Sequence, residues 1–243
     1  MVVKTFNITD DPDVTLTAYI SDISGEMKNM QVKPVVLVFP GGAYKYCSDR
    51  EAEPVALAYL AKGFNAFVLR YSLNEKSKFP TPLNDAVAAI EFIRDSSKEF
   101  HTDPQRLAVC GFSAGGHLAA AVSTMTDVRP NACVLGYPCI LSSTSPILAN
   151  PVESVNEYVT KQTPPTFIFA ASNDGCVPIE NSLSYAQALS KNGVSIEMHI
   201  FAEGDHGFSL GTDVVCENKA FLNVVHPNSY WLDRSAEWLK KMM

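Results

Sequence analysis

The sequence predicts an α/β fold built on a mostly parallel eight-stranded sheet with helices on both faces. Short strand-like runs alternate along the chain with longer segments of helical periodicity, the order typical of a parallel sheet covered on both sides. Several runs, such as Pro34–Pro40, are apolar without interruption, as strands buried on both faces are. No repeat, low-complexity tract or linker breaks the pattern. We therefore expect a single domain spanning residues 1–243.

Eight runs in the chain are expected to form strands. Val2–Ile8 and Val14–Ile20 alternate apolar and polar residues around an Asp/Pro turn, which predicts an antiparallel pair. The other six runs are Pro34–Pro40, Phe64–Arg70, Leu107–Cys110, Ala132–Leu135, Thr166–Ala170 and Ile196–Phe201. Ligands of parallel sheets gather at the carboxyl ends of the strands, so functional residues are expected there.

Five helices are expected between and after these strands. Leu83–Phe100 carries apolar residues at the spacing of one helical face, and Glu53–Lys62 is followed by a glycine suited to a helix C-terminus. The others are Ala114–Met125, Ile179–Asn192 and Ser229–Met243. The irregular stretch Cys139–Pro165 contains one short helix candidate, Val152–Thr160. Little or no cap over the sheet is therefore expected.

Composition and charge limit the classes of partner. The chain is 47% hydrophobic and 19% charged, which is ordinary for a folded globular domain. Its net charge of −7 argues against a nucleic-acid partner, which would need clustered Lys and Arg. The first residues lack the pattern of a secretion signal, and no apolar run approaches a membrane span. We expect a cytoplasmic location and no membrane partner.

The six cysteines show no paired close spacing: Cys47, Cys110, Cys133, Cys139, Cys176 and Cys216. Two of them lie in apolar runs, where a thiol behaves as a small hydrophobe. No CxxC motif or zinc-finger spacing occurs. We expect reduced thiols without structural disulfides, and neither a metal site nor a cofactor.

The segment Gly111-Phe112-Ser113-Ala114-Gly115 matches G-x-S-x-G. It follows an expected strand and opens an expected helix, which is the setting of a nucleophile elbow. Glycines beside a sharp, strained turn avoid clashes with the returning chain, and the turn aims the hydroxyl at helix N-terminal amides. A serine that merely caps a helix is the alternative. The strand–turn–helix context favours Ser113 as a nucleophile.

A serine nucleophile needs a general base, and five histidines are candidates. His206 lies in a glycine-flanked loop directly after the last expected strand, at the carboxyl end of the sheet. The other four lie in a helix, in a strand or beside turns, where structural roles are ordinary: His117, His199, His101 and His226. We expect His206 to be the base.

The base in turn needs a carboxylate that orients it. Asp174 follows an expected strand and also lies at the carboxyl end of the sheet. Asp205 and Glu203 are alternatives, but a carboxylate next to the histidine in sequence reaches its inner ring nitrogen with difficulty. Asp174 could also serve only to bind turn amides. Its position favours the catalytic interpretation.

The segment after the third expected strand, Pro40-Gly41-Gly42-Ala43-Tyr44, predicts an oxyanion hole. Small residues allow backbone amides to approach a tetrahedral oxygen closely. We expect the amides of Gly42, Ala43 and Ala114 to form the hole. A Gly-Gly turn without catalytic duty is the alternative, which weakens once a serine nucleophile is accepted.

Together these motifs resemble the α/β-hydrolase esterases, and among them the acetyl-esterases and xylan-esterase-like proteins. The matching stretches are 40–44, 48–51, 69–72, 111–118, 174–178 and 204–207. Members of that fold use the chain order Ser, Asp, His found in this sequence. The hormone-sensitive-lipase branch has His-Gly-Gly-Gly where this chain has Pro40-Gly41-Gly42-Ala43, which places membership of that branch in doubt. The resemblance implies hydrolysis of carboxylic esters, acetylated sugars among them.

The leading hypothesis is a serine esterase that acts on small-molecule esters through an acyl-enzyme, with no cofactor. Without a cap, no dry wall holds a long acyl chain, so short acyl groups should be preferred. A prolyl-oligopeptidase-like peptidase shares the triad, but such enzymes usually add a large gating domain. A non-catalytic ligand binder would be indicated by loss of the serine or histidine, and both are present. The sequence leaves the oligomeric state open.

Overall fold

One eight-stranded sheet runs through the computed structural model, which describes residues 1–243. Its spatial order is β1-β2-β4-β3-β5-β6-β7-β8. The strands are β1 Val2–Asn7, β2 Thr15–Ile20, β3 Lys33–Phe39, β4 Asn65–Arg70, β5 Thr102–Phe112, β6 Ala132–Gly136, β7 Thr166–Ala171 and β8 Ile196–Phe201. Strand β2 pairs antiparallel with β1 and β4, and every other pair is parallel. The predicted fold class is confirmed.

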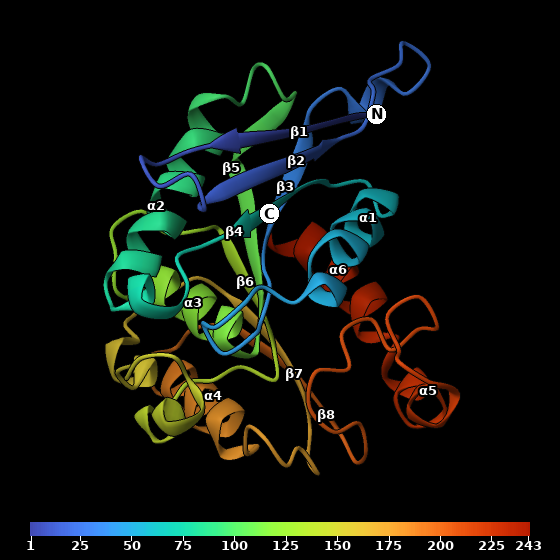
Figure 1. Ribbon diagram of the computed structural model, residues 1–243. Helices are drawn as coiled ribbons and strands as arrows, with labels where there is room; N and C mark the ends of the chain where they lie inside the picture. The colour runs from blue at the N-terminus through green and yellow to red at the C-terminus, as the bar shows by residue number, and fades with distance from the viewer.

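Helices cover both faces of this sheet (Figure 1). They are α1 Glu53–Ala61, α2 Thr81–Asp95, α3 Ser113–Thr124, α4 Glu180–Lys191, α5 Lys219–Val225 and α6 Trp231–Met242. Alternate residues of β3 supply two separate cores: Val35 and Leu37 pack with α2, α3 and α4, whereas Val36 and Val38 pack with α1 and α6. An uninterrupted apolar strand is thus explained by burial of both its faces.

Helix α2 differs from its prediction at both ends, and the expected helix Leu83–Phe100 was too long. The helix begins with a proline in its first turn and ends at Asp95. Two serines follow, and their side chains favour turns over a helix interior. The ring of Phe100 then packs 5.3 Å from that of Phe67 on β4, which leads the chain into β5 earlier than predicted.

Helix α5 is absent from the predicted elements. It has seven residues, and the side chain of Asn218 caps its N-terminus by accepting the N–H of Phe221. An Asn before a short apolar stretch is the signal that could have identified it.

The stretch Cys139–Pro165 contains no α-helix. Two 3₁₀ helices, Ser142–Ile147 and Val155–Tyr158, lie there instead, so the expected helix Val152–Thr160 is only a single short turn. Because this stretch holds only two short 3₁₀ helices, it forms no helical cap over the sheet, as predicted. None of the helices has both the length and the apolar character needed to span a membrane. That residues 1–243 form a single domain stays a prediction.

Candidate active site

The turn between β5 and α3 places Ser113 at the first position of the helix. Its φ of +52° lies in the left-handed region, which is unfavourable for a residue with a Cβ. Sterics make the glycines obligatory. A Cβ on Gly111 would lie 2.2 Å from the carbonyl oxygen of Gly115, and a Cβ on Gly115 would lie 2.1 Å from that of Phe39. Backbone packing therefore fixes the position of the serine.

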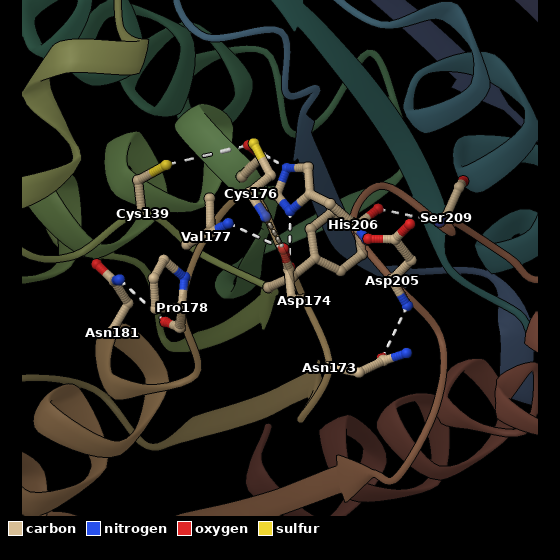
Figure 2. A network of polar contacts seen from close by, with 12 residues as sticks. Cys139, Asn173, Asp174, Cys176, Val177, Pro178, Asn181, Asp205, His206 and Ser209 are labelled. Carbon is tan, nitrogen blue, oxygen red and sulfur yellow. Dashed lines mark hydrogen bonds and ion pairs between the residues drawn. The ribbon is translucent and has the colours of Figure 1, made fainter.

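His206 joins Ser113 to Asp174 through its two ring nitrogens. Its Nε2 lies 2.9 Å from Ser113 Oγ, and its Nδ1 lies 2.7 Å from Asp174 Oδ2. Figure 2 shows the imidazole ring and the carboxylate with the dashed bond between them. A carboxylate only accepts hydrogen bonds, so Nδ1 carries the proton and Nε2 is free to accept the serine hydroxyl. The structure thus brings the three predicted residues together in an order suited to proton transfer.

The buried carboxylate of Asp174 is held by backbone amides. Its Oδ1 accepts the N–H groups of Cys176 at 2.9 Å and Val177 at 2.8 Å, which leaves Oδ2 directed at the imidazole (Figure 2). Asp205, one of the two alternatives, binds backbone instead: its Oδ1 accepts the N–H of His206 at 2.8 Å. The side chain of Asp205 thus shapes the loop, and Asp174 contacts the ring.

His117 occupies a structural position inside α3. Its Nε2 donates to the carbonyl oxygen of Glu153 at 3.3 Å, and its Nδ1 accepts the hydroxyl of Tyr44 at 3.0 Å. Burial lowers the pKa of His117 to about 4. A neutral imidazole therefore ties the helix that begins at Ser113 to the loop after β3.

Three other histidines have contacts of their own outside the triad. His199 lies 3.1 Å from Glu197 Oε1 and stacks on Phe167. His226 Nδ1 lies 3.3 Å from the carbonyl oxygen of Gly211, and His101 is an exposed turn residue with a positive φ.

Of the three residues expected to form an oxyanion hole, Gly42 and Ala43 line the cavity beside Ser113, whereas the fully buried Ala114 is not among its lining residues. Gly42 and Ala43 have φ angles of +126° and +58°, and no backbone or side-chain oxygen accepts their N–H groups. Ala114 lies in the first turn of α3, where amides lack intrahelical acceptors and no side chain caps the helix. A cavity of about 160 Å³ is lined by Gly42, Ala43, Ser113 and His206.

A larger cavity of about 650 Å³ adjoins this small one. The two share Tyr46, Ser48 and Arg50 in their walls. Hydrogen-bonding and charged side chains line much of the larger cavity: Ser48, Asp49, Arg50, Glu53, Arg70 and Glu217. The small cavity is therefore lined by Ser113 and His206, and the large one offers polar contacts beside them.

Sequence reasoning assigned no role to Glu51, Tyr137 and Cys139, which lie close to Ser113 or His206. The Sγ of Cys139 lies 4.0 Å from Ser113 Oγ, and the carboxylate of Glu51 forms part of the small cavity's wall. Glu51 stands in a polar stretch of sequence, and nothing local indicates that its side chain is buried. No group of three or more His, Cys, Asp or Glu side chains is arranged to hold a metal ion.

Two family models match the chain. One, described as BD-FAE, matches residues 21–135, and the other, the prolyl oligopeptidase family, matches residues 145–223. The acetylxylan esterase of Xylanibacter ruminicola is 30% identical over 230 residues, which cover 86% of this chain and 46% of that protein. The chain thus spans less than half the length of this curated relative.

Two solved structures match nearly the whole chain. MGS-M1, an α/β hydrolase enzyme from a Medee basin deep-sea metagenome library, is 44% identical with a TM-score of 0.94, covering 100% of this chain and 98% of that one. An acetyl ester-xyloside bifunctional hydrolase from Caldicellulosiruptor lactoaceticus is 33% identical with a TM-score of 0.83, covering 98% and 96%.

Proposed function

The chain belongs to the α/β-hydrolase family, as its resemblance predicts, and on that premise we propose that it hydrolyses carboxylic esters with Ser113 as nucleophile. The observation that carries this proposal is the hydrogen-bonded series Ser113–His206–Asp174 beside unpaired amides. A nucleophile, a base and an orienting acid are the minimal set for acyl transfer through a serine.

In the first half of the proposed reaction, Ser113 Oγ attacks the carbonyl carbon of the ester while its proton passes to His206 Nε2. The carbonyl oxygen becomes an oxyanion that accepts hydrogen bonds from Gly42, Ala43 and Ala114. Asp174 stabilises the imidazolium through Nδ1. The bond to the alcohol oxygen then breaks, and this oxygen takes the proton from Nε2. The alcohol leaves, and the acyl group stays on Ser113.

In the second half, water replaces the alcohol. His206 Nε2 removes a proton from the water as its oxygen attacks the acyl carbon, and the same amides bind the second oxyanion. The bond from Ser113 Oγ then breaks, and the proton on Nε2 returns to the serine oxygen. A carboxylic acid is released, and the starting state is restored.

The small volume of the cavity beside Ser113 supports a short acyl group. The cavity beside Ser113 holds only about 160 Å³. Ile147, at the end of the 3₁₀ helix Ser142–Ile147, is one of its lining residues, and no cap helix extends it. Each additional methylene stabilises a bound acyl chain by about 0.8 kcal/mol only where an apolar wall surrounds it. We therefore propose that acetyl to butyryl esters are preferred.

The larger cavity supports a polar alcohol. Its hydrogen-bonding side chains suit the hydroxyl groups of a sugar, and the exposed ring of Tyr46 lies in the shared wall. Two similar proteins are named as an acetylxylan esterase and as an acetyl ester-xyloside hydrolase. We therefore propose acetylated sugars as the substrate class of this chain.

Labelling with a fluorophosphonate tests the nucleophile. The wild type should react covalently, and Ser113→Ala should lose labelling and about 10³-fold or more in kcat, as when triad members are removed from other hydrolases. Labelling of the variant at the wild-type rate would show that the nucleophile lies elsewhere.

A substrate panel tests the reaction class. Aryl esters from acetyl to decanoyl, acetylated xylo-oligosaccharides and proline-containing peptide amides should give the highest kcat/KM for short esters. A dominant amide activity would indicate a peptidase, and a specificity constant that rises through decanoyl would contradict the short-acyl proposal. An inert wild type would indicate a ligand binder.

A further inference from the structure

The side chain of Glu51 is a buried carboxylate at the wall of the triad cavity, and the proposed reaction does not use it. It is 3% exposed and forms no ion pair. Its Oε2 accepts the N–H of Gly41 at 2.8 Å, and its Oε1 accepts the hydroxyl of Tyr137 at 2.7 Å. Both neighbours are donors, which matches an ionised carboxylate that only accepts.

Tyr137 extends these contacts to the loop of the histidine. Its hydroxyl oxygen accepts the N–H of Ser209 at 3.0 Å, and its ring lies 5.1 Å from that of His206 at an angle of 68°. The hydroxyl of Ser209 donates to the carbonyl oxygen of Arg50 at 2.6 Å. Figure 2 shows Ser209 and His206 on this same loop. The contacts therefore cross from the segment of Glu51 to that of the base.

Gly41 extends the contacts in the opposite direction, to the oxyanion loop. A Cβ on Gly41 would lie 2.7 Å from Glu51 Oε2 and 2.9 Å from the Cβ of Ser113. Gly41 is thus packed between the carboxylate and the nucleophile, and it directly precedes Gly42 and Ala43. A shift of the carboxylate would therefore move Gly42 and Ala43, which line the cavity.

Burial raises the pKa of Glu51 above its ordinary value, and the hydrogen bonds from Tyr137 and Gly41 offset only part of this rise. Burying a carboxylate is unfavourable unless donors surround it. An apolar side chain could fill the same space without that penalty. The carboxylate offsets this penalty by accepting one hydrogen bond at each of its two oxygens.

We propose that Glu51 is a positioning residue, which holds the oxyanion amides and the histidine loop at the separation required by the tetrahedral intermediate. It acts through Gly41 on one side and Tyr137 on the other. The inference rests on the proposed ester hydrolysis and adds a residue to the machinery of that reaction.

Glu51→Gln tests the inference with nearly unchanged volume. The amide keeps one oxygen but presents an NH₂ group to one of the two donors, so the loop should shift. We expect kcat on an aryl acetate to fall about 10- to 100-fold, less than when an oxyanion donor is removed outright, with KM within about twofold of the wild type. The affinity for a trifluoromethyl ketone, which forms a tetrahedral adduct with Ser113, should fall by the same factor as kcat.

Tyr137→Phe is a second variant that removes one of the two hydrogen bonds to Glu51. It tests the positioning role even if Glu51→Gln does not fold. It should lower kcat and the affinity for the trifluoromethyl ketone by the same factor, and this factor should be smaller than that for Glu51→Gln. In the double variant the loss should be smaller than the product of the two single losses, because both residues belong to one network.

Two matched substitutions elsewhere serve as controls. Glu91→Gln changes an exposed carboxylate on α2, and Tyr185→Phe removes the hydroxyl of a buried tyrosine on α4 that has no hydrogen-bond partner. Both should keep wild-type kcat and inhibitor affinity. The concentration of active sites is measured by titration with fluorophosphonate, and rates are divided by it. Unfolded protein then does not affect the rates.

Three outcomes separate the inference from the function on which it rests. A folded Glu51→Gln with kcat within twofold of the wild type would overturn the positioning role. A fall in kcat without any change in inhibitor affinity would overturn it as well. If the wild type neither labels nor hydrolyses esters, the proposed function fails first, and the positioning role fails with it.

Discussion

The two sides of the triad are held in place by different kinds of interaction. On the side of the nucleophile, Gly111 and Gly115 bring backbone against backbone, and the position of Ser113 follows from local sterics. On the side of the base, the loop of His206 is held by side chains from distant parts of the chain. Backbone packing tolerates almost no substitution, whereas we expect a network of side chains to weaken by degrees when it loses one member.

Ser209 illustrates the second kind of support. Its N–H binds Tyr137, its hydroxyl binds Arg50, and its carbonyl oxygen accepts the indole N–H of Trp231 at 2.8 Å. The indole ring in turn stacks on Phe169 at 4.1 Å. Four separate segments of the chain therefore help to place the histidine loop, and no short sequence motif contains them all. They contribute Tyr137, Arg50, Trp231 and Phe169.

The largest expected effect comes from changing the side chain that orients the base. Asp174→Asn should preserve the fold but lower kcat by about 10⁴-fold, because an amide favours the wrong tautomer of the imidazole. Asp205→Asn is the matched control and should have less than about a tenth of that effect, since the Asp205 side chain binds only backbone. Steady-state kinetics of both variants decide the matter, and the reverse ranking would show that the wrong carboxylate was chosen.

Gly115→Ala tests the backbone side. The added Cβ would lie 2.1 Å from a carbonyl oxygen of Phe39, so β3 and α3 must separate. We expect a loss of at least about 3 kcal/mol in the free energy of unfolding, at or above the upper range for overpacking, and loss of most activity. Denaturant titration measures the loss in the free energy of unfolding. Gly175→Ala is the control, since a Cβ there meets no atom within 4 Å. Equal stability of the two variants would contradict the steric account.

Acid stability tests the neutral His117, which links α3 to the loop after β3. Its pKa is about 4 in the folded protein and about 6.5 when unfolded. The unfolded chain therefore binds the extra proton between these values, and stability must fall as the pH drops from about 6.5 to 4. The loss should reach about 3 kcal/mol at pH 4 and change little further from this group below that pH. Unfolding titrations of the wild type and His117→Gln measure it, and equal pH slopes would refute it.

The smallest expected effect is the removal of one bond from the histidine loop. Ser209→Ala leaves the carbonyl of Arg50 without its donor. It should reduce the free energy of unfolding by about 1 kcal/mol and kcat by less than about tenfold, because the other contacts of the loop remain. Ser190→Ala, at an exposed position on α4, should change neither. A thermal melt with parallel kinetics is sufficient, and a complete loss of activity would show that the network does not weaken by degrees.

This contrast also explains which features could be predicted from the sequence. The central strands were predictable because burial on both faces leaves continuous apolar runs, and the elbow because its steric demands fall within five residues. Asp174 and His206 could be identified as candidates from topology alone, because both lie in loops at the carboxyl ends of expected strands. The end of α2 depends on Phe100 reaching Phe67, and sequence periodicity does not contain that contact.

The surroundings of the triad were not predictable for the same reason. Glu51 and Tyr137 are 86 residues apart in sequence and meet through one hydrogen bond. Glu51 lies in the stretch 48–51 that matches the family, but neither side chain has a local pattern that indicates its burial or its partner. The two cavities likewise arise where loops from separate βα units meet, so their size follows only from the folded chain.

The contact between Trp231 and Ser209 has a consequence for the order in which the chain is synthesised. Trp231 is the first residue of α6, which follows every strand of the sheet in chain order. During translation the elbow of Ser113 emerges long before this helix. The loop of His206 lacks the indole that holds its backbone until α6 has left the ribosome and docked. The hydrogen bond from Trp231 to the histidine loop can therefore form only after every strand of the sheet has been synthesised.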